Sequence, residues 1–512
     1  MKRRIFASVT GVLLLAAFAG FAPRLTRAQQ AAAPAFDDGT GKALTAVAGA
    51  ATMRPRAFEY LTQVSDDIGA RVTGSPAAAQ AIDWGVATMK EIGLENVHAE
   101  SWKLSHGWTR GSAEAELISP IRRRLMVDAL GWVGSTAPGG VEADVVAVNA
   151  YQLSDELKNS ASWRGKILVV VQKGDAPKDR MAAFAKFGDF LNAAHAAGAI
   201  AVIGGQGGRK AAGMHLTHTG ALGFDTYYDI PVVSMAAEDQ DQLERYLDRG
   251  KTPRLKINVQ NQVTSGPVDS ANVVGDIRGT QFPDQIIVVG GHLDSWDLAS
   301  GATDNGVGTS VTLGAAEAIM KSGYKPKRTI RFVLFTGEEQ GLLGSLAYVK
   351  AHQNEMSNYV ATLVLDAGQG AVTGFQMGGH DELIPVMQKF AGTLQAFGKL
   401  EVDNEVEFGT DTGPFTLAGI PAINLNQDTT EYKYSHHSAV DTLDKVQPDI
   451  LDRNAAIMAL AAFWIADRPE RFAAPWPAEK TAKMLIDQHQ DGMLKLFGLW
   501  PFGNLGSEPE TK

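Results

Sequence analysis

Residues 285–344 decide the fold: the stretch begins QIIVVGGHLDSWDLASGATDNGVG and ends TIRFVLFTGEEQGLLG. Two runs of β-branched and other apolar residues, 286–289 and 329–335, are typical of strands buried on both faces. Between them, the spacing of apolar residues predicts a helix that begins near Asp304 and ends before Gly323. A strand, a helix and a second strand in this order predict an α/β fold.

Polar side chains stand where each of these strands ends. His292 and Asp294 follow the first strand, and Glu338 and Glu339 follow the second. In open α/β sheets, binding sites form beyond the carboxyl ends of the parallel strands. We therefore expect these four side chains to meet at one edge of the sheet.

Five side chains in the second half of the chain are candidate metal ligands, because each follows a predicted strand or lies in the loop beyond it. They are His292, Asp304, Glu339, Asp366 and His437. Two imidazoles and three carboxylates suit zinc, and a bridging carboxylate lets such a set hold two Zn²⁺ ions. Cobalt or manganese could occupy the same ligands. Each residue alone has an ordinary structural explanation, such as an Asp that caps a helix, but their coincidence favours a metal site.

Three further carboxylates have predicted catalytic or supporting roles. Glu338 is placed to take a proton from a metal-bound water and to pass it to the leaving amine. Asp294 could accept the second N–H of His292 and thereby fix its tautomer. Asp441 stands four residues after His437 and could do the same for that imidazole.

The sequence does not support other hydrolytic chemistries. It has no G-x-S-x-G motif for a serine hydrolase and no H-E-x-x-H zinc-binding helix. Residues 204–208 are Gly-rich but lack the glycine spacing of a dinucleotide-binding loop. A cysteine nucleophile and disulfide bonds are excluded, because the chain has no cysteine.

The N-terminus has the pattern of a targeting segment. Three basic residues (2–4) precede the apolar stretch 5–21, and Thr26-Arg27-Ala28 resembles a small-x-small cleavage site. This pattern predicts a signal peptide over residues 1–28, cleaved after Ala28, and therefore a periplasmic or secreted protein. An uncleaved anchor is the alternative, although the apolar stretch is short for a membrane span.

The charge of the chain limits its partners. The formal net charge is −10, and it would be −15 without the first 28 residues, which hold five basic and no acidic side chains. An acidic surface argues against nucleic acid or an anionic membrane as a partner. We expect no membrane association once the signal peptide is removed.

At 512 residues, the chain is expected to contain two or three domains. Residues 29–54 are Ala-rich and polar and are predicted to be a flexible leader. Residues 119–262 have their own short strands and an Ala-rich helix but no cluster of candidate ligands, so they are predicted to be an inserted domain. This insert could act as a binding module or join two copies of the chain into a homodimer. Residues 55–118 and 263–470 would form the catalytic domain, and 471–512 a C-terminal extension.

Five motifs carry a family resemblance. GGHLDS, GATDNGVG, FTGEEQGLLGS, LDAG and HHSAVDT, in this order, resemble the signature blocks of the dizinc exopeptidases of the aminopeptidase / glutamate carboxypeptidase family. IGARVTGSP, GTDTGPF and GIPAINL are similar to further blocks of that family, and part of the insert resembles its protease-associated domain. The resemblance covers roughly residues 55–466. It implies the zinc exopeptidase fold, with a mixed, mostly parallel central sheet, helices on both faces and a smaller α/β insert.

The resemblance also implies the arrangement of the ligands. One zinc would be held by His292, Asp304 and Asp366, and the second by Asp304, Glu339 and His437, so that Asp304 is the bridge. Glu338 matches the family's general base.

The resemblance also bears on the two adjacent histidines, on two tyrosines and on Thr412. His437, and not His436, matches the ligand, because H-S-x-x-D-T aligns with the family's H-x-x-x-D-T. Tyr432 and Tyr434 are candidates for polarising the scissile carbonyl of the substrate. Thr412 departs from the family's motif and leaves substrate contacts there open.

The predicted function is an exported, zinc-dependent exopeptidase that hydrolyses short peptides or dipeptides through a metal-bound hydroxide, with Glu338 as the general base. Two alternatives stay open: a single-zinc, acyl-transferring cyclase with the same fold, and a non-catalytic peptide-binding protein. The sequence leaves open whether the amino end or the carboxyl end of the substrate is recognised.

Overall fold

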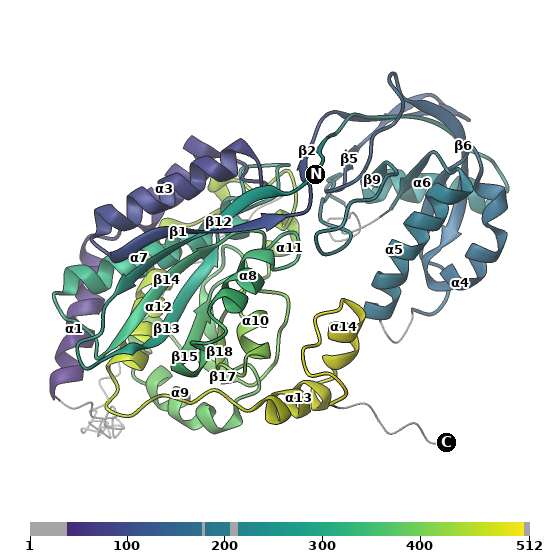
Figure 1. Ribbon diagram of the computed structural model, residues 1–512. Coiled ribbons are helices and arrows are strands. Elements are labelled where there is room, and N and C mark those ends of the chain that lie inside the picture. The colour runs from purple at the N-terminus through teal and green to yellow at the C-terminus, as the bar shows by residue number, and fades with distance from the viewer. Residues whose placement is uncertain (1–37, 177–179, 205–212, 506–512) are drawn as a thin grey trace, which may run out of the picture.

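The computed structural model describes residues 38–176, 180–204 and 213–505 (Figure 1). These residues form two eight-stranded sheets and a two-stranded ribbon. The predicted signal peptide and its cleavage site lie outside the described residues. Of the helices that are described, none combines the length and the apolar composition that a bilayer span requires.

The first sheet has a parallel centre and antiparallel additions on both sides. Its strand order is β1-β12-β14-β13-β15-β18-β16-β17. The four parallel central strands are β14 (Arg328–Phe335), β13 (Phe282–His292), β15 (Tyr359–Val364) and β18 (Ala422–Gln427). The outer strands are β1 (Glu95–Leu104), β12 (Val268–Ile277), β16 (Val372–Gln376) and β17 (Glu401–Asp403). The mixed, mostly parallel sheet predicted from the sequence is confirmed.

Helices cover both faces of this sheet because alternate residues of its central strands point to opposite sides. Ile287 and Val289 of β13 pack in one apolar cluster, and Ile286 and Val288 pack in another. The first cluster includes α1 (Asp38–Met53), α2 (Ala57–Thr62), α3 (Pro76–Ile92), α7 (Val307–Ser322), α9 (Ile384–Ala391) and α12 (Pro448–Asp467). The second includes α8 (Leu343–Ala351) and α10 (Gly413–Leu417). We call the first sheet with these helices the main unit.

Helix α1 corrects the predicted flexible leader. The sequence analysis assigned no regular structure to residues 29–54, but residues 38–53 form a helix that contacts α7 and α12. Ala43, Leu44, Val47 and Ala51 are buried, at the spacing of one helical face. The sequence did not predict this helix, because most of its apolar side chains are small alanines in a stretch that resembles low-complexity sequence.

The second sheet lies in a separate unit, and its strand order is β4-β3-β10-β6-β7-β8-β9-β5. Its strands are β3 (Ala113–Ser119), β4 (Arg123–Leu125), β5 (Val127–Ala129), β6 (Val141–Asn149), β7 (Ile167–Val171), β8 (Ala201–Ile203), β9 (Val232–Met235) and β10 (Arg254–Val259). Its helices are α4 (Leu153–Glu156), α5 (Arg180–Ala197) and α6 (Ala237–Asp248). An apolar cluster of its own holds this unit together. We call residues 113–259 the insert.

The chain enters and leaves the insert through one ribbon. Strands β2 (Gly107–Thr109) and β11 (Gln262–Thr264) pair antiparallel between the two units. The start of the insert differs from the predicted boundary at residue 119, because β3 pairs with β4 and β10 of the second sheet. The alternating pattern of β3 predicts a half-buried strand but does not identify the sheet to which it belongs.

Beyond α12, the chain runs along the main unit and turns towards the insert (Figure 1). Two short helices, α13 (Ala478–Asp487) and α14 (Asp491–Leu496), replace the single amphipathic piece predicted near residues 484–497. The backbone leaves the helical region at His489, where φ is 58°. We call residues 471–505 the C-terminal segment.

Candidate metal centre and active site

The five predicted ligands converge at the carboxyl ends of the central strands. His292 ends β13, Asp304 precedes α7, Glu339 follows β14, Asp366 follows β15, and His437 follows the short helix α11 (Tyr432–Ser435). Parallel strands bring these loops to one edge of the sheet, as expected for an open α/β fold.

Asp304 lies between two groups of ligand atoms. Its Oδ1 is 3.3 Å from His292 Nε2, and its Oδ2 is 3.3 Å from His437 Nε2. Asp366 Oδ1 is 3.1 Å from His292 Nε2, and Glu339 Oε2 is 2.9 Å from His437 Nε2. Two atoms that share one tetrahedral zinc at about 2.0–2.1 Å lie about 3.3 Å apart. The spacing of His292, Asp304 and Asp366 therefore fits one ion. The contacts of His437 with Asp304 and Glu339 form a second set of donors on the other side of Asp304.

The tautomers of both histidines also fit metal binding. His292 Nδ1 is 3.0 Å from the backbone carbonyl of Asp294, and His437 Nδ1 is 3.3 Å from the backbone carbonyl of Thr219. A carbonyl oxygen can only accept, so each Nδ1 donates and each Nε2 lone pair faces the carboxylates. A lone pair that faces carboxylate oxygens requires a cation or a proton between them.

The pKa shifts and the buried oxygens of the site also indicate that cations bind there. Burial works to lower the pKa of His437, but the carboxylates of Glu339 and Asp304 outweigh it and raise that pKa to about 10. Burial raises the pKa of Glu339 to about 7. Asp304 Oδ2 and Glu339 Oε1 are buried, and no described group forms a hydrogen bond with either oxygen. Cations would satisfy these oxygens and both imidazoles.

Asp294 accepts the second N–H of His292 as predicted, but through its backbone carbonyl, and its carboxylate has further partners. Its Oδ1 is 3.6 Å from His292 Nδ1, whose hydrogen bond goes to the backbone carbonyl of Asp294. The carboxylate accepts instead from the Thr73 hydroxyl at 2.8 Å and from the backbone N–H groups of Glu338 and Glu339 at 3.4 Å each. Asp294 thus fixes the turn that carries both glutamates.

Asp441 does not orient His437, which corrects the second prediction of this kind. Its carboxylate accepts from the backbone N–H of Thr303 at 2.5 Å and from that of Asp304 at 3.3 Å. Burial raises the pKa of Asp441 to about 7. The left-handed backbone of His437, with φ of 56°, breaks the helical geometry on which the four-residue spacing relied.

The insert supplies the contacts that hold the His437 loop. The backbone N–H of Thr219 donates to the His437 carbonyl at 2.8 Å, and the Thr219 carbonyl faces His437 Nδ1. His218 Nδ1 is 2.8 Å from the His436 carbonyl. Sequence reasoning missed this contact, because the residues are 218 positions apart and the insert has no ligand motif.

The neighbouring histidines differ in their contacts. The rings of His436 and His437 stack with centroids 3.8 Å apart, and the ring nitrogens of both can reach Asp304. The short contacts with Asp304 and Glu339 are made by His437.

Arg71 is a supporting residue that sequence reasoning did not assign, although it belongs to the IGARVTGSP motif. Its guanidinium is fully buried and donates to five backbone carbonyls, those of Val64, Gly69, Leu293, Ser300 and Gly301. Burial lowers its pKa to about 10. These bonds brace the loop between His292 and Asp304.

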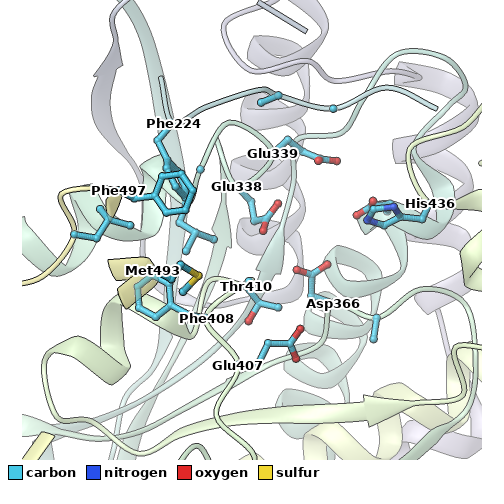
Figure 2. Close-up of a pocket in the computed structure, with 18 of the residues that line it drawn as sticks. Phe224, Glu338, Glu339, Asp366, Glu407, Phe408, Thr410, His436, Met493 and Phe497 are labelled. Carbon is cyan, nitrogen blue, oxygen red and sulfur yellow. The ribbon is translucent and has the colours of Figure 1, made fainter. Parts of the chain in front are cut away.

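A cavity of about 790 Å³ opens over the ligands. Figure 2 shows the carboxylates of Glu338, Glu339 and Asp366 on the side of His436, with Phe224 and Phe497 opposite.

The structure separates the two predicted tyrosines. Tyr432 lines the cavity, whereas Tyr434 is not among its lining residues and its ring lies under the Lys433 ammonium. Residues two apart on the helical turn α11 point in different directions, so only one of the two tyrosines reaches the cavity.

A polar network behind the cavity orients one further side chain. The Thr410 and Thr412 hydroxyls lie 3.1 Å from Asn424 Oδ1, and Asn424 Nδ2 donates to Gln376 Oε1 at 2.9 Å. Gln376 lines the cavity, and within the described chain its Nε2 has no acceptor. The network therefore presents an amide donor to the cavity, and Thr412 lies behind it, buried and not among the residues that line the cavity.

Comparison with known proteins places the chain in a family. Residues 272–462 match peptidase family M28. Carboxypeptidase Q from Mus musculus is 32% identical over 81% of this chain and 86% of its own length, and the Homo sapiens protein gives the same three values. The chain belongs to peptidase family M28. This M28 chain is therefore a metallopeptidase, as predicted.

Solved structures resemble the M28 chain along most of its length. A peptidase M28 precursor from Shewanella amazonensis SB2B has a TM-score of 0.74 and 28% identity, and the match covers 86% of this chain and 100% of that chain. A zinc aminopeptidase from Bacillus subtilis shares the fold with a TM-score of 0.62 and 21% identity over 82% of this chain and 97% of that one.

The region that matches the M28 family holds all five candidate ligands and Glu338. Arg71, the insert and the C-terminal segment lie outside it. Contacts from these outer parts of the M28 chain nevertheless reach the site, through the Arg71 guanidinium and the Thr219 backbone.

Proposed function

We propose that the chain is an exported exopeptidase that hydrolyses short peptides or dipeptides and depends on two zinc ions. The convergence of two imidazoles and three carboxylates around Asp304, with Glu338 beside them, carries this proposal. Relatives named carboxypeptidase Q and a structural neighbour described as a zinc aminopeptidase support the same class of reaction.

His292 and Asp366 would hold one ion, Glu339 and His437 the other, and Asp304 both. Zinc ions bound there would lower the pKa of a bound water and polarise the scissile carbonyl. Cobalt or manganese suits the same donors.

Glu338 is the group that we assign to proton transfer. Its side chain is largely buried, and its Oε2 lies 3.9 Å from His292 Nε2, at the edge of the ligand cluster. Burial raises its pKa well above the ordinary value for a carboxyl. A carboxylate with a raised pKa is a better base, so Glu338 takes a proton from the attacking water and delivers it to the leaving amine.

Tyr432 is the group that we assign to the substrate carbonyl. Burial, together with the nearby carboxylates of Asp304 and Asp366, raises the pKa of Tyr432 well above its ordinary value. The hydroxyl therefore stays protonated and can donate a hydrogen bond to the oxygen on which negative charge develops.

The walls of the cavity favour short substrates. Loop residues of the insert, such as Gly220 and Phe224, and residues of the C-terminal segment, such as Met493 and Phe497, line the cavity beside the ligands. A peptide must fit between these parts, which suits the end of a chain or a dipeptide.

The test uses purified full-length protein with its metal content measured by mass spectrometry. We expect two zinc ions per chain and release of free amino acids from unblocked dipeptides. Glu338→Gln should keep both ions and lose about 100- to 10,000-fold in kcat. Full turnover by this variant would remove Glu338 from the mechanism. One ion per chain with release of ammonia from a glutaminyl peptide would indicate the cyclase instead, and peptide binding without any turnover would indicate a binding protein.

A further inference from the structure

We infer that the insert and the C-terminal segment together build a subsite for a large apolar side chain of the substrate. This inference rests on the proposed hydrolysis of peptides in the same cavity. It assigns a role to two parts of the chain that lie outside the M28 match.

The apolar side of the cavity comes from three separate parts of the chain. We call it the apolar wall, and its residues are Phe224, Leu342, Phe408, Met493, Leu494 and Phe497. Phe224 belongs to the insert, the last three belong to the C-terminal segment, and the others belong to the main unit. Figure 2 shows the rings of Phe224, Phe497 and Phe408 close together, with Met493 between them and Glu338 beside them.

Phe224 is fixed against the catalytic loop. A Cβ on Gly341 would lie 1.7 Å from Phe224 Cδ1, so the ring packs directly on the glycine backbone. The next residue, Asp225, donates its backbone N–H to the Gln340 carbonyl at 3.1 Å. Its carboxylate accepts from the backbone N–H of Ser105 at 3.0 Å and from the Ser105 hydroxyl at 2.6 Å. These contacts hold the Phe224 ring against Gly341, which follows Glu338 by three residues in the chain.

Phe497 continues the apolar wall from the other side. Its ring meets the Phe224 ring edge-on, with centroids 4.6 Å apart and an angle of 81° between the planes. Leu494, one turn earlier, is fully buried in a cluster with Phe408 and Leu485. Helix α14 also contacts α5 of the insert. The C-terminal segment is thus fixed to both units where it faces the cavity.

The chemistry of the cavity selects among side chains. No lysine or arginine is among the described residues that line it, and Glu405 and Glu407 lie on its polar side. An acidic side chain of the substrate would therefore meet carboxylates. A leucine- or phenylalanine-sized side chain would leave water and contact the apolar wall, which favours binding in proportion to the apolar area buried.

The test compares kcat/KM for Ala-Ala, Leu-Ala and Ala-Leu with zinc-loaded, full-length protein. Leucine has three more carbon atoms to bury than alanine, so we expect kcat/KM for one leucine dipeptide to exceed that for Ala-Ala by at least about 10- to 200-fold. Phe497→Ala and Met493→Ala should each reduce that ratio by about tenfold. Trp500→Ala is the matched control: this ring lies in the same segment, packs against Phe502 and does not line the cavity. It should leave the ratio unchanged.

Two results would overturn the subsite. One is an unchanged ratio in both Phe497→Ala and Met493→Ala, with near-ultraviolet circular dichroism as evidence that each variant is folded. The other is wild-type protein that hydrolyses Ala-Ala as fast as both leucine dipeptides. Failure of the zinc-loaded wild-type protein to hydrolyse any of these dipeptides or an unblocked short peptide would refute the proposed function itself.

Discussion

Replacing Arg71 by methionine should destabilise the main unit and weaken metal binding together. The guanidinium donates to five backbone carbonyls, and three of these bonds are fully buried, namely those to Val64, Leu293 and Gly301 at 3.2, 2.6 and 2.8 Å. Methionine fills a similar volume but donates nothing. Water can reach the two remaining carbonyls, so only the three buried ones would lose their donor without replacement.

The expected magnitude follows from those three carbonyls. A buried polar group without a partner costs about 1–3 kcal/mol, so three of them cost roughly 3–9 kcal/mol. The variant no longer buries a cation, which offsets part of this cost, and we expect a net loss of about 3–5 kcal/mol. Because the same bonds brace the loop that leads to Asp304, zinc affinity should fall by about 10- to 100-fold, as for loss of a residue that orients a ligand.

The assay is urea unfolding of metal-free and zinc-loaded protein, together with competition for zinc against a chelator. Lys103→Met is the control, because the exposed Lys103 ammonium pairs with the exposed carboxylate of Asp269 at 2.5 Å on the surface of the main unit. The control should cost no more than about 1 kcal/mol. A loss equally small in Arg71→Met, with unchanged zinc affinity, would refute the reasoning.

Three further predictions concern single histidines and the polar side of the cavity. His437→Ala should release one zinc per chain, whereas His436→Ala should retain both; equal losses by mass spectrometry would contradict the assignment of the ligand. Gln376→Glu replaces the amide donor that faces the cavity with a carboxylate and should raise KM by about tenfold, measured by dipeptide kinetics, while an unchanged KM would exclude a substrate contact. Burial lowers the pKa of His380 to about 4. Between pH 6.5 and 4 this side chain is therefore protonated in the unfolded chain but not in the folded chain, so the free energy of unfolding falls as the pH falls. Over that range the free energy of unfolding of the wild-type protein should fall by up to about 3 kcal/mol more than that of His380→Gln. Equal losses in the two proteins, measured by urea unfolding at each pH, would contradict this.

Local patterns in the sequence predicted the centre of the fold and the ligand set. The run Ile286–Val289 is apolar on both faces, as is typical of a buried strand, and its carboxyl end positions His292. The same reasoning placed Glu339 and Asp366. Functional residues that directly follow a buried parallel strand can be predicted from the sequence, because the topology of the sheet brings them to the site and no distant contact is needed.

Contacts between distant segments could not be predicted. Nothing near His437 indicates that its N–H meets the carbonyl of Thr219, and the spacing suggested Asp441 instead. The pattern of β3 fits either sheet, and α1 becomes a clear helix only against α7 and α12. In each case the deciding energy comes from packing between parts of the chain that are far apart in sequence.

The attachment of the insert at Thr219 links metal occupancy to the position of the insert. Covalently, the insert is joined to the main unit where the chain passes through the ribbon of β2 and β11. Because His437 contacts both the ligand cluster and Thr219, zinc binding and docking of the insert stabilise the same orientation of one imidazole. By thermodynamic reciprocity, an ion bound by His437 would oppose separation of the two units, and a chelator would promote it.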